Sequence, residues 1–209
     1  MNILAIECST SHASLCLAGE ASCAEDWVAE RNHDAFLFPA LQHALEALAD
    51  RTLDVILVGS GPGSYGGVRV ALAAASGIAL VKGCKIAPIC SWESLSEGRA
   101  SILSDAKRGG WTLRRPDSQI SVLDTAAVLQ ALAEGELIWS VESEAALARA
   151  GLVLPRTGLQ PTAQGLVDTW LSLNPEEKER RCSLPAEPIY VRPPHITTPK
   201  HKPWEIRTS

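Results

Sequence analysis

The sequence lacks the residue spacings that build metal sites and disulfide frameworks. Its six cysteines are scattered, mostly inside apolar runs, and no two of them form a CxxC pair. Its five histidines include no pair that is four residues apart. Because zinc sites and disulfide-rich folds need such spacings, we expect buried, reduced thiols in a cytoplasmic protein.

Long apolar runs and long basic tracts are also missing. No stretch reaches the roughly 18 uninterrupted apolar residues of a membrane helix, and the N-terminus shows no charged region followed by a cleavage site. The formal net charge of −5 argues against a large nucleic-acid footprint, while 46% hydrophobic residues suffice for a core. We expect one domain or two small ones, with no membrane association.

The chain is organised around residues 54–80, DVILVGSGPGSYGGVRVALAAASGIAL. An apolar run at 55–58 predicts a buried strand, and residues 59–67 hold five glycines and one proline. The alanine-rich stretch from residue 68 to 80 or 82 predicts a helix that is apolar nearly all round. This order presents backbone N–H groups at a helix N-terminus, where an anion or a closely packed backbone can sit.

Three interpretations of the glycine loop compete. Gly61, Gly63 and Gly66 spell GxGxxG, but a dinucleotide site also needs an acid about 20 residues on, and the first acid there is Glu93. A Walker loop needs Gly-Lys-Ser/Thr after the glycines, and Gly67 is followed by valine instead. The third interpretation is that the glycines only let the helix pack tightly on a sheet.

Hydrophobic periodicity predicts the other elements. Leu37, Leu41 and Leu45 repeat at helical spacing in a helix that Asp34 can cap, and Asp124 and Thr162 can cap two later helices. The predicted strands cover 2–8, 13–17, 21–30, 55–58, 85–90, 101–105, 111–114, 136–141 and 189–191. The predicted helices cover 34–50, 68–82, 92–99, 124–133, 143–150, 162–173 and 176–181.

The first strand ends in an acid and a hydroxyl-rich turn. Glu7, Ser9 and Thr10 lie where a strand turns back on itself, which resembles the first phosphate loop of actin-like and sugar-kinase-like ATPases. In that superfamily the acid is usually aspartate and helps to hold a magnesium ion. The three residues are therefore candidates for a nucleotide loop, working or vestigial. The alternative is an ordinary hairpin with Ser/Thr turn chemistry.

Several segments together resemble the TsaB (YeaZ) family of bacterial proteins, which take part in making threonylcarbamoyladenosine in tRNA. The segments are ILAIECST, HDAFLFPALQHAL, GPGSYGGVRVALAAASGIAL, APICSWESL, SDAKRGGW and PIYVRPP, in the family's order. The resemblance covers residues 2–111 and 188–194, and it is weak over 112–185. It departs from the family at Glu7, where aspartate is usual, and at Tyr65-Gly66-Gly67, where Phe-Thr-Gly is usual.

The resemblance implies an α/β fold of the actin-like/Hsp70-like ATPase, or ribonuclease H-like, type. Such a fold has two lobes, here with a reduced second lobe. We expect an N-terminal lobe over 1–100, a reduced C-terminal lobe over 101–192, and a proline-rich tail over 193–209.

The family's catalytic relative, TsaD, shares the glycine block and holds a metal through an HxxxH pair. The positions that match this pair here are Ser91 and Leu95, which cannot replace two imidazoles as ligands. The resemblance therefore implies a scaffold with no catalytic residues and no metal of its own, which supports TsaD in modifying the adenosine beside the anticodon.

The resemblance also implies an interface. In the family, two helices pair with the same two helices of a partner, and here these are 34–50 and 68–82. We expect the partner to be TsaD or, without it, a second copy of the chain. An ATPase third subunit (TsaE) and ATP or ADP at the interface are compatible with the resemblance, and tRNA contact is expected only indirectly. The expected interface residues are His33, Leu37, Leu41, Leu45, Gly63, Arg69, Ala71, Ala74, Ala75 and Ile78.

Two enzyme classes are the alternatives. A nucleotide-dependent enzyme of the actin-like ATPase or sugar-kinase class would use Glu7, Ser9 and Thr10, but it needs a second phosphate loop, and none is recognisable in 112–185. A peptidase would need a metal or an activated nucleophile. Ser64 has no histidine that the pattern places beside it.

Overall fold

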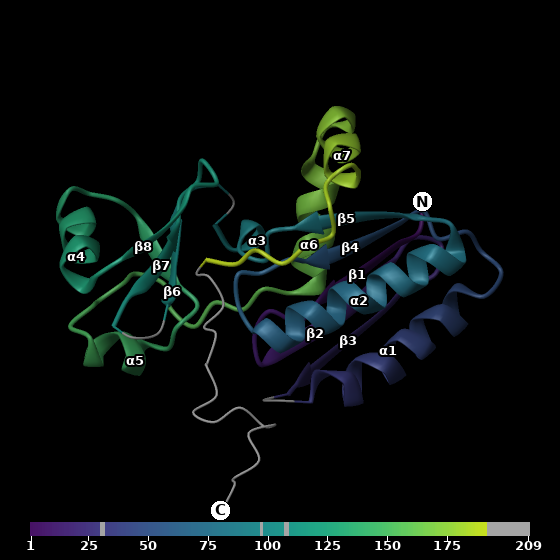
Figure 1. Cartoon of the computed structure of the whole chain (residues 1–209), viewed down its shortest axis with the longest axis horizontal. Coiled ribbons are helices and arrows are strands. Elements are labelled where there is room, and N and C mark those ends of the chain that lie inside the picture. The colour runs from purple at the N-terminus through teal and green to yellow at the C-terminus, as the bar shows by residue number, and fades with distance from the viewer. Residues whose placement is uncertain (30–31, 97, 107–108, 192–209) are drawn as a thin grey trace, which may run out of the picture.

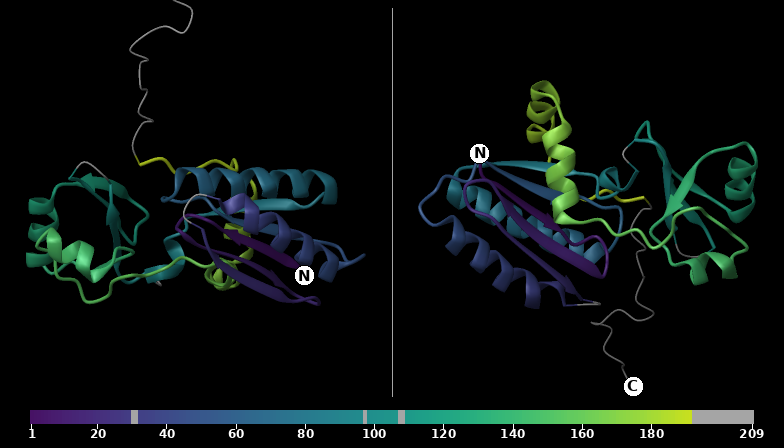
Figure 2. Two further views of the ribbon diagram at one scale, coloured as in Figure 1. Left: turned by 90° about the horizontal axis from the view of Figure 1, so that it is seen from below. Right: turned by 180° about the vertical axis from the view of Figure 1, so that it is seen from behind.

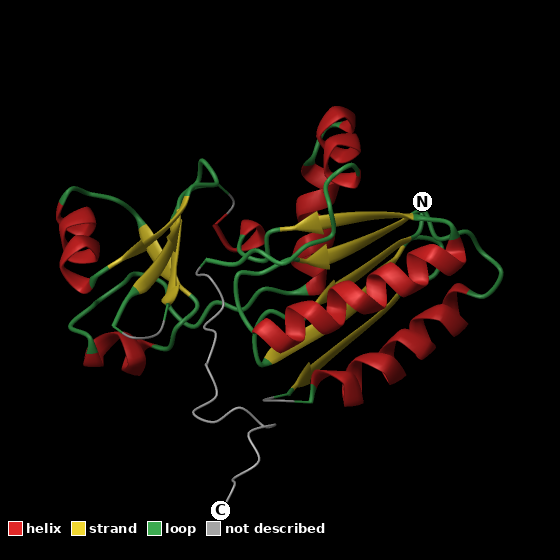
Figure 3. Cartoon of the chain, in the orientation of Figure 1, coloured by secondary structure: helices red, strands yellow, loops and turns green. Residues whose placement is uncertain are grey.

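A computed structural model of the chain describes residues 1–29, 32–96, 98–106 and 109–191. It shows two β-sheets that lie side by side along the long axis, each with its own helices (Figure 1). Figure 3 shows the same arrangement by type of element. The predicted tail at 193–209 lies outside the described residues.

The first sheet contains β1 (Ile3–Glu7), β2 (His12–Ala18), β3 (Cys23–Val28), β4 (Val55–Gly59) and β5 (Lys85–Ile89). Their order is β3-β2-β1-β4-β5, antiparallel on the β2–β3 side and parallel on the β4–β5 side. β4 and, up to its last residue Glu7, β1 are apolar and fully buried because helices cover both faces of the sheet there. The edge strand β3 instead alternates between half-buried and exposed residues.

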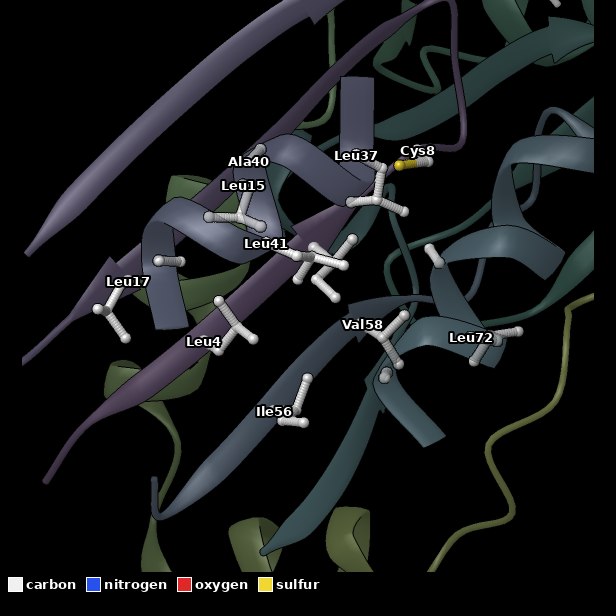
Figure 4. Packing of buried hydrophobic residues seen from close by; sticks show 14 of the residues in the cluster. Leu4, Cys8, Leu15, Leu17, Leu37, Ala40, Leu41, Ile56, Val58 and Leu72 are labelled. Carbon is white, nitrogen blue, oxygen red and sulfur yellow. The ribbon is translucent and has the colours of Figure 1, made fainter. Parts of the chain in front are cut away.

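Two long helices, α1 (His33–Leu48) and α2 (Tyr65–Lys82), cover one face of this sheet (Figure 2). Leucines of α1 and apolar residues of α2 meet β1, β2 and β4 in one buried cluster. Figure 4 shows the side chain of Leu37 beside Cys8, which directly follows β1. This cluster fixes how close the two helices lie to each other.

The opposite face is covered by α6 (Ala163–Ser172), which comes from much later in the chain. Its Leu166, Val167 and Trp170 pack on Ile3 and Leu57 in a second buried cluster. α7 (Pro175–Cys182) follows and contacts β5, where Glu179 accepts a hydrogen bond of 2.7 Å from Lys85 Nζ. Two helices from late in the chain, α6 and α7, thus pack on a sheet whose strands all come from the first 89 residues (Figure 2).

The second sheet contains β6 (Ser101–Asp105), β7 (Trp111–Arg114), β8 (Ile120–Leu123) and β9 (Ile138–Ser140), in the order β8-β7-β6-β9. Helices α4 (Thr125–Ala133) and α5 (Glu144–Arg149) belong to this part, and a third buried cluster fills it. The short helix α3 (Glu93–Ser96) stands where the chain passes from one sheet to the other (Figure 1).

The predicted α/β fold is confirmed, and each of its two sheets contains both parallel and antiparallel strand pairs. The lobe boundaries at 100/101 and 192/193 stay a prediction. The range predicted for the second lobe includes α6 and α7. Apolar side chains of α6 cover the open face of the first sheet, and the charged helix α7 contacts β5 through Lys85 and Glu179.

Two of the predicted helix caps are confirmed. Asp124 Oδ1 accepts from Ala127 N at 2.8 Å, and Thr162 Oγ1 accepts from Gly165 N at 3.0 Å. The cap predicted at Asp34 is wrong, because α1 begins earlier and its N-cap residue is Asn32. Hydroxyl and carboxylate side chains just before an apolar repeat therefore located these starts only to within two residues.

Two other predictions need correction, and one strand was not predicted. α2 begins at Tyr65 rather than residue 68, because Ser64 Oγ accepts from Gly67 N and caps the helix inside the glycine block. β8 had no prediction, since ISVL is a short run without clear alternation. Residues 189–191 are not a strand, although Ile189 N donates to Ser60 O at 2.8 Å, because this segment pairs with no strand of the first sheet.

Among the described residues, α2 alone is long and apolar enough to cross a membrane by length and composition. Its Val68, Ala71 and Ala75 are buried against the first sheet. The helix is therefore a partly buried core helix, and some of its other apolar side chains, such as Leu80 and Val81, are exposed.

Candidate functional site

The glycine loop packs directly onto the turn that follows β1. Ser64 N donates to Ser9 O at 2.6 Å. A side chain at Gly63 would collide with the carbonyl oxygen of Ser9, and one at Gly67 would collide with that of Cys8. Close backbone approach therefore accounts for these two glycines, as in the third interpretation of the loop.

The candidate nucleotide-loop residues lie on this turn. Glu7 is fully buried, and its Oε1 accepts from Ser9 N at 2.6 Å. Ser9 is buried as well, whereas Thr10 Oγ1 lies 2.9 Å from Gln160 Oε1 of the segment before α6. The structure thus brings Glu7 and Ser9 together and turns Thr10 toward a different part of the chain.

Burial dominates the chemistry of Glu7. It raises the pKa of the carboxyl above its usual value of 4.5, while the hydrogen bond from Ser9 N and the nearby Ser91 side chain act in the opposite direction. Gly59 lies so close that a side chain there would collide with Oε2. A carboxyl in such surroundings favours its neutral form and serves the packing of the turn.

A Glu7→Gln variant is expected to gain stability relative to the wild type as the pH rises above 4.5. The native carboxyl then keeps a proton that the unfolded chain has released, so wild-type stability falls with pH until the raised pKa is passed. Glutamine does not titrate. Thermal unfolding midpoints of both proteins between pH 4 and pH 8 measure the difference, and a pH-independent difference would contradict the prediction. The exposed Glu176→Gln serves as the control.

His33 is the first residue of α1 and is buried against the start of α2. A side chain added at Gly67 would come within 3.1 Å of its Nε2. Burial lowers the pKa of this histidine, and the neighbouring Asp34 opposes the shift. His33 therefore packs as a neutral side chain between the two helices.

The outer surface of α1 and α2 carries an apolar groove of about 1020 Å³, the α1/α2 groove. Leu41, Leu45 and Phe38 line it from α1, and Phe38 is 55% exposed. Val70, Ala74 and Ile78 line it from α2, with Ala73 and Gly77 between them. Asp34, Gln42 and Glu46 add polar groups from α1. An apolar hollow of this size on an exposed helix pair is typical of a binding surface.

The expected interface residues fall into three groups. Leu41, Leu45, Ala74 and Ile78 line the α1/α2 groove, and Gly63 and Arg69 are exposed near the first turn of α2. Leu37, Ala71 and Ala75 are fully buried, and His33 is nearly so. Leu37, Ala71 and Ala75 face the chain's own sheet, His33 lies between the two helices, and all four are closed to a partner in this structure.

The residues that sequence reasoning missed are Phe38, Val70, Ala73 and Gly77. For the residues of α2 the sequence contains a helical repeat that could have found them, since Val70, Ala74 and Ile78 are four residues apart, as are Ala73 and Gly77. Because α2 is apolar nearly all round, hydrophobicity alone did not separate the face on the sheet from the face on the groove.

The two positions that match the HxxxH pair of TsaD lie beside the glycine loop. Ser91 is fully buried, and its Oγ accepts from Gly61 N at 3.1 Å. Leu95 is half-buried in α3. In this chain the serine supports the backbone of the loop, and the leucine brings no donor atom.

Comparison with known proteins gives a consistent set of relatives. The family model for TsaD, tRNA N6-adenosine threonylcarbamoyltransferase, matches residues 27–107. The tRNA threonylcarbamoyladenosine biosynthesis protein TsaB of Bacillus subtilis (strain 168) is 31% identical over 119 residues, which cover 52% of this chain and 52% of that protein. The match thus spans about half the length of this curated relative.

Two solved structures share the fold. An uncharacterized protein from Pseudomonas aeruginosa with similarity to the peptidase YEAZ superposes with a TM-score of 0.69 at 21% identity, over 91% of this chain and 99% of that chain. YeaZ from Pseudomonas aeruginosa superposes with a TM-score of 0.64 at 20% identity, over 90% and 99%. At these identities the likeness concerns the fold.

Proposed function

We propose that the chain is a non-catalytic subunit of the TsaB/YeaZ type that binds a TsaD-type transferase, which its similarity to TsaB of Bacillus subtilis and to the TsaD family model supports. The complex would form N6-threonylcarbamoyladenosine beside the anticodon of tRNA in the cytoplasm. The α1/α2 groove carries this proposal, because it is the large apolar hollow on the two helices that the resemblance assigns to the partner.

The chemistry of the groove suits a pair of helices from a partner. Ala73, Ala74 and Gly77 are small, so a partner helix can approach the backbone of α2 closely. Phe38 and Leu45 stand on the α1 side and offer larger apolar area. Burying such surfaces gains about 25 cal/mol per Å² at little side-chain entropy cost for alanine and glycine.

The positions that match the HxxxH pair support a non-catalytic role. Ser91 is committed to the glycine loop and Leu95 is apolar, so the chain relies on its partner for the transfer chemistry. The alternative is a nucleotide-dependent enzyme that uses Glu7, Ser9 and Thr10. The burial of Glu7 and Ser9 under the glycine loop weighs against it.

We extend the proposal to the other partners that the family resemblance implies. Without the transferase, two copies of the chain would pair through the same α1/α2 groove. An ATPase third subunit (TsaE), with ATP or ADP at the interface, would join the complex of the two proteins rather than this chain alone. The purified chain is accordingly expected to hydrolyse no ATP.

The function is tested by reconstitution with the TsaD of the same organism and the remaining enzymes of the modification. We expect threonylcarbamoyladenosine to form on tRNA only when this chain is present, as measured by nucleoside mass spectrometry. Formation at an unchanged rate without the chain would contradict the proposal, and ATP hydrolysis by the chain alone would favour the enzyme alternative.

An Ala74→Arg variant is expected to weaken binding to TsaD by at least 100-fold while leaving the monomer folded. The arginine would place a charge in the middle of the apolar groove, where a partner would have to desolvate it. Titration calorimetry measures the affinity and thermal unfolding measures the fold. Ser76→Arg is the matched control, because Ser76 is exposed on the same helix but outside the groove. Equal affinity of both variants would contradict the prediction.

A further inference from the structure

Two exposed tyrosines form a pair at the start of α2. Tyr65 is the first residue of that helix, and Tyr190 comes from the segment that follows α7. Their ring centroids are 5.6 Å apart, with an angle of 32° between the ring planes. The two residues are 56% and 51% exposed, so the pair keeps a large aromatic surface open to solvent.

Arg69 joins this pair from the next turn of α2. Its guanidinium carbon lies 5.0 Å from the centroid of the Tyr65 ring, and its Nη1 donates to the Tyr65 hydroxyl at 2.8 Å. The contact holds the Tyr65 ring in place and sets a permanent positive charge beside it. Together, Tyr65, Arg69 and Tyr190 form what we call the tyrosine platform.

The platform is preorganised by the backbone beneath it. Ile189 N donates to Ser60 O at 2.8 Å, which fixes the residue before Tyr190 to the glycine loop. Ser64 caps α2 just before Tyr65. A binding surface whose side chains are already held in place loses less conformational entropy when a ligand arrives.

A small hollow of about 240 Å³ lies directly beside the platform. Tyr65 and Tyr190 form part of its wall, and the polar residues Ser64, Ser104, Asp105 and Thr112 also line it. The hollow is smaller than the roughly 300–1,000 Å³ of pockets for drug-sized ligands. It therefore suits one planar group with polar edges rather than a whole cofactor.

We propose that the tyrosine platform binds unpaired bases of RNA, by stacking on Tyr65 and Tyr190 with Arg69 beside a phosphate. Aromatic rings next to cations are the usual means of binding single-stranded RNA, since every base has a face that can stack. The inference deepens the proposed function and rests on it, because it gives this chain a small, direct contact with the tRNA. The footprint is confined to a few nucleotides, in keeping with the overall negative charge.

The test uses the full chain, alone and mixed with TsaD, and fluorescence anisotropy of a labelled, unmodified tRNA transcript. Tyr65→Ala and Tyr190→Ala are each expected to weaken tRNA binding about 10-fold or more, since stacking contributes about 1–3 kcal/mol per base and 1.36 kcal/mol is tenfold. Tyr65→Phe and Tyr190→Phe keep a ring and should retain binding. Arg69→Ala should weaken binding and reduce its salt dependence.

Arg156→Ala is the matched control for Arg69→Ala. Arg156 also lies over an aromatic ring, 4.3 Å from the centroid of Trp139, but in the part of the chain that forms the second sheet. Its loss should leave tRNA binding unchanged. A fully paired RNA duplex of the same length should bind more weakly than the tRNA, because its bases are not free to stack.

Four results would overturn the inference. They are no tRNA binding by the wild-type protein or unchanged binding by the alanine variants, equal binding of duplex and tRNA, complete competition by ATP, and loss of TsaD affinity in the alanine variants. ATP competition would assign the platform to a free nucleotide, and loss of TsaD affinity would assign it to the protein interface. The proposed function is tested separately, because TsaD affinity that persists without RNA binding leaves that function standing.

Discussion

Replacing Glu93 with alanine is expected to lower the free energy of unfolding by about 3–5 kcal/mol, the usual cost of removing one partner from a buried ion pair. Glu93 of α3 accepts two hydrogen bonds from Arg181 of α7, at 2.6 and 2.9 Å, and one of 3.2 Å from Arg114 of β7. The side chains of Arg114 and Arg181 are only 5% and 11% exposed. Without the carboxylate, both guanidinium groups lose their shared partner.

The position of Glu93 adds to this effect. Arg114 belongs to the second sheet, whereas α7 packs on the first, so one carboxylate ties together the two parts of the chain. Urea denaturation of the wild type and Glu93→Ala measures the change in stability. The control is Glu176→Ala, an exposed glutamate in the first turn of α7. A change below about 1 kcal/mol, the value for a surface ion pair, would contradict the prediction.

Gly67→Ala is expected to lower the free energy of unfolding by about 3 kcal/mol or more. Overpacking in a close-packed region costs about 1–3 kcal/mol, and here the obstacle is backbone, which yields less easily than a side chain. The added methyl group would collide with the carbonyl oxygen of Cys8 and press on His33. α2 and the turn after β1 would have to separate.

Gly66→Ala is the matched control for this prediction. Gly66 lies in the same turn of α2, and a side chain there would meet nothing within 4 Å. Since alanine favours a helix over glycine by about 1 kcal/mol, Gly66→Ala should stabilise the protein slightly. Thermal unfolding of both variants compares them directly. Equal effects of the two variants on stability would contradict the prediction, because they would show that the close contact between Gly67 and the turn does not require glycine.

The first sheet and its two outer helices could be predicted because their signals are local. Strands such as ILAIE and VILVG are apolar runs, and α1 repeats leucine at helical spacing. The packing of α6 on the first sheet could not be predicted, because Trp170 and Leu166 show an apolar face but not which sheet it meets. The same limit applies to α2, whose alanines look alike in sequence although Ala75 is buried and Ala73 is exposed.

The candidate site shows where the local signals end. The family resemblance implied an interface with Leu41, Leu45, Ala74 and Ile78, and these four residues line the α1/α2 groove. The tyrosine platform unites residues from α2 and from the segment after α7, which are far apart in the chain, so no sequence window contains it. The triad of Glu93, Arg114 and Arg181 is hidden for the same reason, since its members come from three separate elements.

The central claim is that the α1/α2 groove holds a TsaD-type partner, and light scattering after gel filtration tests it most directly. The chain would be measured alone, mixed with TsaD from the same organism, and mixed again as the Ala74→Arg variant. We predict a stable complex with one copy of each protein per binding surface, which forms with the wild type and with Ser76→Arg but not with Ala74→Arg. Separate elution of the wild-type chain and TsaD, or an intact complex with Ala74→Arg, would contradict the claim.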